Sequence, residues 1–152
     1  MSTKISTIYD SLHTLVSTAL SDHKELHIPD IIELNEDALL AKGWAIKISG
    51  ATPVIRQIAC SVYHVSRTAI ITNTLTNYAA MADKTRRHES EKALLENQTK
   101  ILKAVKNDCT LSGVVINLEY TGDNGIEYIY GDNDELDNVM IQSNFTFEYY
   151  EQ

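Results

Sequence analysis

Two histidines stand at a spacing that a metal ion could use. His23 and His27 are four residues apart, and two histidines at this spacing on one helix face can bind zinc. The metalloprotease pattern requires a Glu directly after the first His, whereas Glu25 comes one position late. The segment also follows the first helical pattern, so the two rings need not share a face. A polar helix end is therefore the preferred interpretation, and we expect no metal here.

A second candidate for cation binding is the acidic loop that contains Asp132, Asp134, Glu135 and Asp137. Several carboxylate side chains so close together in the sequence are typical of calcium-binding loops. The calcium-loop pattern requires a Gly where Asp137 stands, an oxygen ligand where Leu136 stands, and flanking helices. A solvated acidic loop is the preferred interpretation, with adventitious calcium binding as the alternative.

Motifs of the common enzyme and nucleotide-binding families are missing from the chain. There is no GxSxG nucleophile elbow, P-loop or GxGxxG loop. His13 is expected on a helix surface and His64 as a hydrogen-bonded core residue of a strand. Cys60 and Cys109 have no zinc or redox spacing, which is typical of a protein made in a reducing cytoplasm. We expect no enzyme, no catalytic residue and no cofactor, and a small enzyme whose site assembles in space remains an alternative.

Charge is distributed unevenly along the 152 residues. The chain has 21 acidic and 13 basic residues, a formal charge of −8, which disfavours a duplex-DNA binder. Residues 84–106 contain seven basic and three acidic side chains, whereas residues 107–152 contain ten acidic side chains and no Lys or Arg. The basic cluster of Lys84, Arg86 and Arg87 lacks interleaved aromatic residues. A protein partner or intersubunit salt bridges therefore explain it better than phosphate binding, and a plain solvated helix start is an equal alternative.

Hydrophobic periodicity predicts the elements that must position these groups. Spacings of three and four predict helices over residues 3–21 and 83–106. Alternating and apolar runs predict strands over residues 44–48, 54–71, 114–120, 126–130 and 139–150. Residues 72–82 are polar and ambiguous. We predict one α+β domain over residues 1–152, a mostly antiparallel sheet of about five strands with two helices packed on one face.

The predicted strand over residues 54–71 is apolar on both faces. This pattern indicates burial on both sides, by helices on one side and by a partner on the other. It makes the strand our best candidate for pairing at a sheet edge with a neighbouring subunit. We therefore add its Tyr63 and Val65 to the basic cluster as candidate subunit-interface residues.

The order of the elements resembles that of the tail terminator proteins of long-tailed bacteriophages, in particular the lambda-type minor tail protein. The resemblance spans nearly the whole chain and is one of pattern and length. The matching parts are the opening helix at residues 5–20, IPDII at 28–32, the strands at 44–48 and 58–65, the helix ending at 105, LSG at 111–113 before a hairpin, the acidic loop, and the final strand FTFEYY at 145–150.

The resemblance implies an α+β protomer of a hexameric ring. Such a ring caps the tail tube, ends its polymerisation and joins the tail to the head-completion or neck proteins, without catalysis or a cofactor. The implied partners are further copies of the chain, the tail tube protein and a head-completion or neck protein, with no membrane. The implied location is the tail-neck region of the virion, after assembly in the host cytoplasm.

A ring of this kind requires two different surfaces that meet head to tail. The basic helix and the acidic C-terminal region are plausible complementary surfaces. DNA would pass through the ring without sequence-specific binding, and an acidic lumen would repel its phosphates. We name Asp132, Asp134, Glu135 and Asp137 for that lumen or for a partner-facing loop. A head-completion or neck adaptor is the first alternative, and a monomeric binding module or small enzyme is the second.

Overall fold

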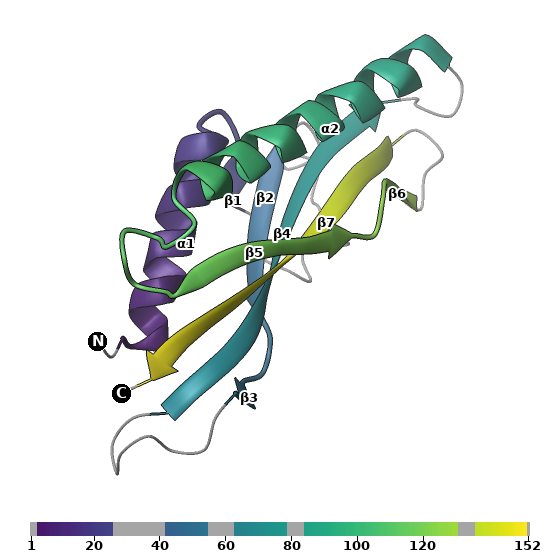
Figure 1. The fold of residues 1–152 in the computed structure, drawn as a ribbon. Helices are drawn as coiled ribbons and strands as arrows, with labels where there is room; N and C mark the ends of the chain where they lie inside the picture. The colour runs from purple at the N-terminus through teal and green to yellow at the C-terminus, as the bar shows by residue number, and fades with distance from the viewer. Residues whose placement is uncertain (1–2, 26–41, 55–62, 79–83, 131–135, 152) are drawn as a thin grey trace.

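A computed structural model describes residues 3–25, 42–54, 63–78, 84–130 and 136–151 (Figure 1). Side chains are outside the description at residues 76–78, 84–87, 129–130 and 136–138. The described residues form two helices and a mixed sheet of seven strands, so the predicted α+β class is confirmed. No helix in these ranges combines the length and the apolar character of a membrane span.

The two helices form where the apolar spacing predicted them. Helix α1 spans Ile5–Ala19 and buries Ile8, Leu12 and Val16, which recur every four residues. Helix α2 spans Lys84–Asn107 and buries Leu94, Ile101 and Val105 on one side. Residues four or seven positions apart lie close to one side of a helix with 3.6 residues per turn, so each set forms a stripe that can pack on the sheet.

The sheet is larger and less regular than predicted. Its order is β1-β2-β4-β7-β5, with β3 beside β4 and β6 beside β7. The strands are β1 (Lys24–Glu25), β2 (Gly43–Ile48), β3 (Thr52–Pro53), β4 (Tyr63–Tyr78), β5 (Asn117–Asp123), β6 (Glu127–Tyr130) and β7 (Leu136–Glu151). The prediction of a mostly antiparallel sheet of about five strands is wrong, because β1 pairs in parallel with β2 and the sheet has seven strands. Strands of two residues, such as β1 and β3, carry no periodic signal.

The centre of the sheet is the antiparallel pair of β4 and β7. Their register runs without interruption from Tyr63 opposite Glu151 to Tyr78 opposite Leu136. The described part of the predicted strand 54–71 lies between β2 or β3 and β7, so its role as a sheet edge is contradicted. Residues 55–62 lie outside the described part of the chain.

Both helices pack on the same face of this sheet. The alternate residues Phe145, Phe147 and Tyr149 of β7 share one core cluster with residues of α1 and α2. A second, smaller core cluster contains Leu75, Leu94, Val139 and Ile141. The other alternate residues of β7 are half-buried, as the polar side of its pattern predicted. The sheet therefore has one helix-covered face and one face that no described helix covers.

Candidate functional site

The outward side of α2 forms a basic ridge. Its members lie three or four residues apart and so line up along the helix: Lys92, Leu95, Glu96, Thr99, Lys103 and Lys106. All six are exposed, and Leu95 exposes 45% of its surface. Within the described ranges, none of its three lysines forms an ion pair with a carboxylate. We call this surface the α2 ridge; its net charge is +2, from three Lys and one Glu.

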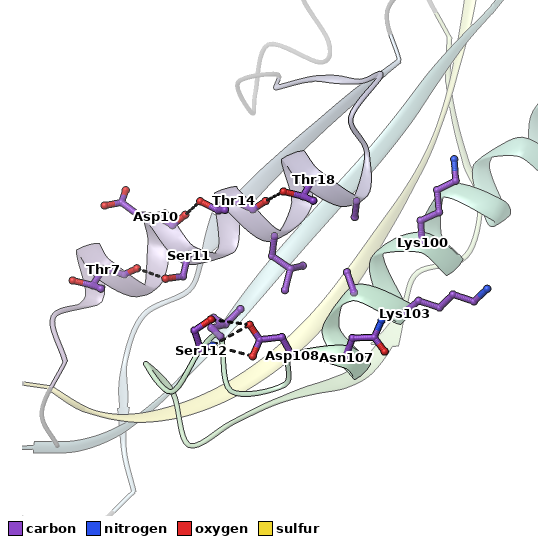
Figure 2. Close-up of a pocket in the computed structure, with 14 residues that line it drawn as sticks. Thr7, Asp10, Ser11, Thr14, Thr18, Lys100, Lys103, Asn107, Asp108 and Ser112 are labelled. Atoms are coloured by element: carbon purple, nitrogen blue, oxygen red, sulfur yellow. Dashed lines mark hydrogen bonds between the residues drawn. The ribbon is translucent and has the colours of Figure 1, made fainter.

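Beside the ridge, a groove of about 660 Å³ runs between α1 and α2 (Figure 2). Its α1 wall carries hydroxyl groups that hydrogen-bond to their own helix. Ser11 donates to the Thr7 carbonyl at 2.9 Å and Thr14 to the Asp10 carbonyl at 3.0 Å. Thr18 donates to the carbonyl of Thr14 at 2.8 Å. The hydroxyl protons are therefore already used, and this wall offers a ligand mainly methyl groups and acceptor oxygens.

The opposite wall and the end of the groove come from α2 and the turn after it. Lys100, Lys103 and Asn107 line the α2 side. Asp108 closes the end, where both of its carboxylate oxygens accept the backbone N–H of Ser112 at 2.9 Å. The lining contains no histidine or cysteine. The groove thus has lysines along one rim and a carboxylate with a neighbouring serine hydroxyl at its end.

Strand β5 and its neighbour β7 present an acidic surface on the other side of the molecule. Glu119 lies opposite Thr146 and Asn117 lies opposite Glu148, so the two carboxylates are diagonal neighbours. Both lie on the sheet face away from the helices, because the adjacent residues Leu118 and Phe147 are buried on the helix side. We call Asn117, Glu119, Thr146 and Glu148 the acidic strand surface.

Charge compensation on this acidic surface is incomplete. Glu148 Oε2 lies 2.9 Å from His64 Nε2, whereas Glu119 forms no ion pair with any residue that the structure describes. Ile116 and Tyr120 expose 46% and 38% of their surface, but they alternate with Asn117 and Glu119 and so lie on the helix side of β5. Strand β5 also lies at the end of the sheet order. The acidic strand surface therefore combines two carboxylates, of which Glu119 has no ion pair among the described residues, with a position at the end of the sheet.

Asp123 ties the acidic strand edge to α2. Its carboxylate accepts hydrogen bonds from the Tyr120 hydroxyl, from Gln98 Nε2 at 3.0 Å and from the Gly125 N–H at 2.7 Å. These donors hold the pKa of Asp123 below its usual range, with Tyr120 the largest cause. Gln98 also donates to Ser143 Oγ at 3.0 Å. Gln98 thus links α2 to β5 by a part-buried hydrogen bond and to β7 by a buried one.

His23 is a structural residue in this arrangement. Its Nδ1 donates to Asp22 Oδ1 at 2.8 Å, and its Nε2 lies 3.1 Å from Asn97 Nδ2. An amide nitrogen only donates, so Nε2 is unprotonated and both ring nitrogens are occupied. Burial of the ring, 1% exposed, lowers the pKa of His23. Hydrogen bonds from Lys42 and then His23 hold the pKa of Asp22 well below its usual range.

The buried His23 predicts a loss of stability in mild acid. Because its folded pKa lies below the unfolded value of about 6.5, the unfolded chain binds this proton first as the pH falls. We expect the free energy of unfolding to decrease below about pH 6.5 by up to about 1.4 kcal/mol per pH unit for this group. The contribution of Asp22 lies below its ordinary pKa of 3.8 and is separate. Denaturant unfolding of wild type and His23→Asn between pH 7 and pH 5 tests this, and parallel curves would contradict it.

Two further described histidines, His13 and His64, are also engaged, whereas His88 of α2 is exposed. His13 Nε2 lies 2.7 Å from Glu25 Oε1, and its Nδ1 lies 2.8 Å from the Tyr9 carbonyl. His64 is buried and hydrogen-bonded, as its strand position predicted. His27, the other half of the possible zinc pair, lies outside the described residues. Within the ranges that the structure covers, no three His, Cys, Asp or Glu side chains are grouped as metal ligands.

The predicted interface residues lie at different depths. Tyr63 exposes 49% of its surface at the start of β4, whereas Val65 is 7% exposed and belongs to the core. Only Tyr63 of this pair can therefore contact a neighbour. The side chains of the basic cluster are outside the description: Lys84, Arg86 and Arg87.

The acidic-loop candidates are largely outside the description as well. Asp132, Asp134 and Glu135 lie outside the described residues. The backbone of Asp137 belongs to β7, opposite Tyr130 of β6 and Asn77 of β4, and its side chain is not described. Their placement at a lumen stays a prediction.

The α2 ridge and the acidic strand surface were not singled out residue by residue from the sequence. The charge blocks were visible, but which lysines face outward depends on how α2 packs. Which glutamates share a face depends on the register of β5 and β7. For Glu148, the alternation along β7 already indicated the polar face.

The chain matches no family model, and no curated protein matches it in sequence. Its function is therefore argued from the surfaces described above and from the order of its elements.

Proposed function

We propose that this chain is a structural protein of a bacteriophage tail that forms a ring, caps the tail tube and ends its polymerisation. The ring would also join the tail to the head-completion or neck proteins. The proposal rests on one observation above all: a single domain carries two oppositely charged surfaces on its two opposite layers. A head-to-tail ring requires two different, complementary surfaces on every protomer.

The arrangement of the elements supports the same proposal. An opening helix, two main strands, a second helix, and two shorter strands that both pair with a long last strand follow in the order that resembles tail terminators. The net charge of −8 suits a ring through which DNA passes without adhering, since like charges repel.

Tube polymerisation tests the proposal directly. The tail tube protein encoded in the same genome is allowed to polymerise with and without the purified chain, and tube lengths are measured in micrographs. We expect shorter tubes with density at one end when the chain is present, and no change with an unrelated acidic protein of the same size. Tubes that elongate freely would contradict the capping role. Binding to filled heads and not to tubes would identify the adaptor alternative instead.

A further inference from the structure

We propose that the α2 ridge of one copy of this chain docks on the acidic strand surface of a second copy. The inference rests on the proposed ring function and names the contact between neighbouring protomers. It involves residues other than the basic cluster at the start of α2, and all of them lie in the described part of the chain.

The lysines of the α2 ridge have no counter-charge among the described residues of their own chain. Lys103 and Lys106 stand three residues apart on one helix face, where like charges repel. Described residues of the same chain supply no ion pair to them. Leu95 lies exposed on the same ridge, and a large exposed apolar side chain amid cations is unfavourable in water. Contact with an acidic surface would neutralise these lysines and would remove Leu95 from water.

The acidic strand surface provides that complement. Glu119 and Glu148 repel each other as diagonal neighbours, and only Glu148 has a described partner, His64. No Lys or Arg follows residue 106 in the sequence, so the C-terminal part of the chain cannot neutralise this surface itself. Charge complementarity of this kind steers association and fixes the register of a specific interface.

The positions of the two surfaces allow a continuous assembly. Helix α2 and strand β5 belong to different layers, the helices and the sheet (Figure 1). The α2 ridge is the exposed side of the helix, and the acidic strand surface lies on the face of β5 and β7 away from the helices. One copy can therefore contact two neighbours at once, which is the requirement for a closed head-to-tail ring. Hydrogen bonds of Gln98 to Asp123 and Ser143 keep the two surfaces in a defined relation.

A second copy fits the α2 ridge better than a nucleic acid does. Nucleic-acid surfaces combine several cations with aromatic side chains that stack on bases. The ridge instead carries Glu96 between its lysines and has no aromatic residue. A second copy supplies the carboxylates of Glu119 and Glu148 to lysines that have no ion pair within the described part of their own chain.

Charge exchange between the two surfaces tests the inference. The particle mass of the full chain is measured by light scattering for wild type, Lys103→Glu/Lys106→Glu and Glu119→Lys/Glu148→Lys, with circular dichroism to verify folding. We expect each double variant to associate at least ~10-fold more weakly than wild type. The fourfold variant, in which all charges are exchanged, should recover assembly. If Glu148→Lys removes the partner of His64 and unfolds the double variant, Glu119→Lys alone is measured in its place.

A matched pair controls for the change in net charge. Lys24→Glu/Lys47→Glu makes the same charge change off the ridge, on β1 and β2, and should assemble like wild type. If wild type assembles and the Lys103/Lys106 variant assembles equally well, the inference is overturned and the ring proposal stands. If wild type stays monomeric with and without the tail tube protein, the ring proposal itself fails. Loss of DNA binding in a gel shift, with assembly unchanged, would assign the ridge to DNA and overturn the inference.

Discussion

Phe145→Ala is expected to lower the free energy of unfolding by about 3–5 kcal/mol, the usual cost of a large-to-small change at a buried aromatic. Phe145 is 0% exposed and belongs to the main core cluster under α1 and α2. It stands in β7 between Ala69 of β4 and Tyr120 of β5, and its ring centroid lies 5.6 Å from that of Tyr120. Small residues such as Ala69 cannot fill the cavity that the deletion leaves.

The neighbouring position supplies the control for Phe145. Thr146 is half-buried on the opposite face of the same strand. Thr146→Ala truncates a side chain of the same strand to alanine without opening the core. We expect it to lower the free energy of unfolding by less than about 1 kcal/mol. Urea unfolding of both variants measures the difference. Equal losses of stability would show that the helices do not pack on the face that carries Phe145.

Asn73→Asp is expected to destabilise the fold by about 3–5 kcal/mol at pH 7, because it places an uncompensated charge in the interior. Asn73 is 0% exposed, and its Nδ2 donates to the Leu94 carbonyl of α2 at 3.2 Å. Its Oδ1 is buried and has no hydrogen-bond partner among the described residues. A carboxylate at this position would lose the donor and would face the Leu94 carbonyl oxygen.

The pH dependence of Asn73→Asp gives the loss a distinct signature. Burial raises the folded pKa of the new carboxyl, so the penalty applies at neutral pH and is relieved as the pH falls toward about 4. Asn73→Leu has a similar shape and no charge, and it also removes the unpaired oxygen. We expect that control to change stability by no more than about 1 kcal/mol. A pH-independent loss in Asn73→Asp would contradict this account.

Helices and strands with a strong hydrophobic period were predictable from the sequence, whereas the pairing of strands that are distant in the sequence was not. Both helices and the final strand have long apolar stripes that only one geometry can bury. The polar segment from Thr72 to Tyr78 has no such stripe, yet it continues β4 because β7 pairs along its whole length and β2 along its first part. Tertiary hydrogen bonding overrode a weak local signal there.

The start of β5 shows a different limit of local patterns. The apolar run from Val114 predicted a strand, but the backbone first makes a tight turn in which Leu111 and Ser112 have positive φ values of 48° and 58°. Asp108 stabilises this turn by accepting the N–H of Ser112. Residues other than glycine rarely adopt a positive φ, so the residue types alone do not predict this turn. The strand consequently begins at Asn117.

The candidate site was predictable only as blocks of charge. The sequence separates a basic helix from an acidic C-terminal third, and the structure places parts of both on opposite layers of the molecule. Val65 illustrates that strand order is not visible in a local pattern. Its apolar neighbours suggested an edge strand, but strand order depends on contacts between distant segments. The α2 ridge likewise depends on which side of the helix meets the sheet.

The central claim is that copies of this chain form a closed ring, and the particle mass of the purified full chain, with electron micrographs of the same sample, tests it most directly. The account predicts rings with a central hole and a mass that is a whole multiple of 17.0 kDa, six copies by the resemblance to tail terminators. A uniform 17.0 kDa species at high protein concentration, unchanged when tail tube protein is added, would contradict it.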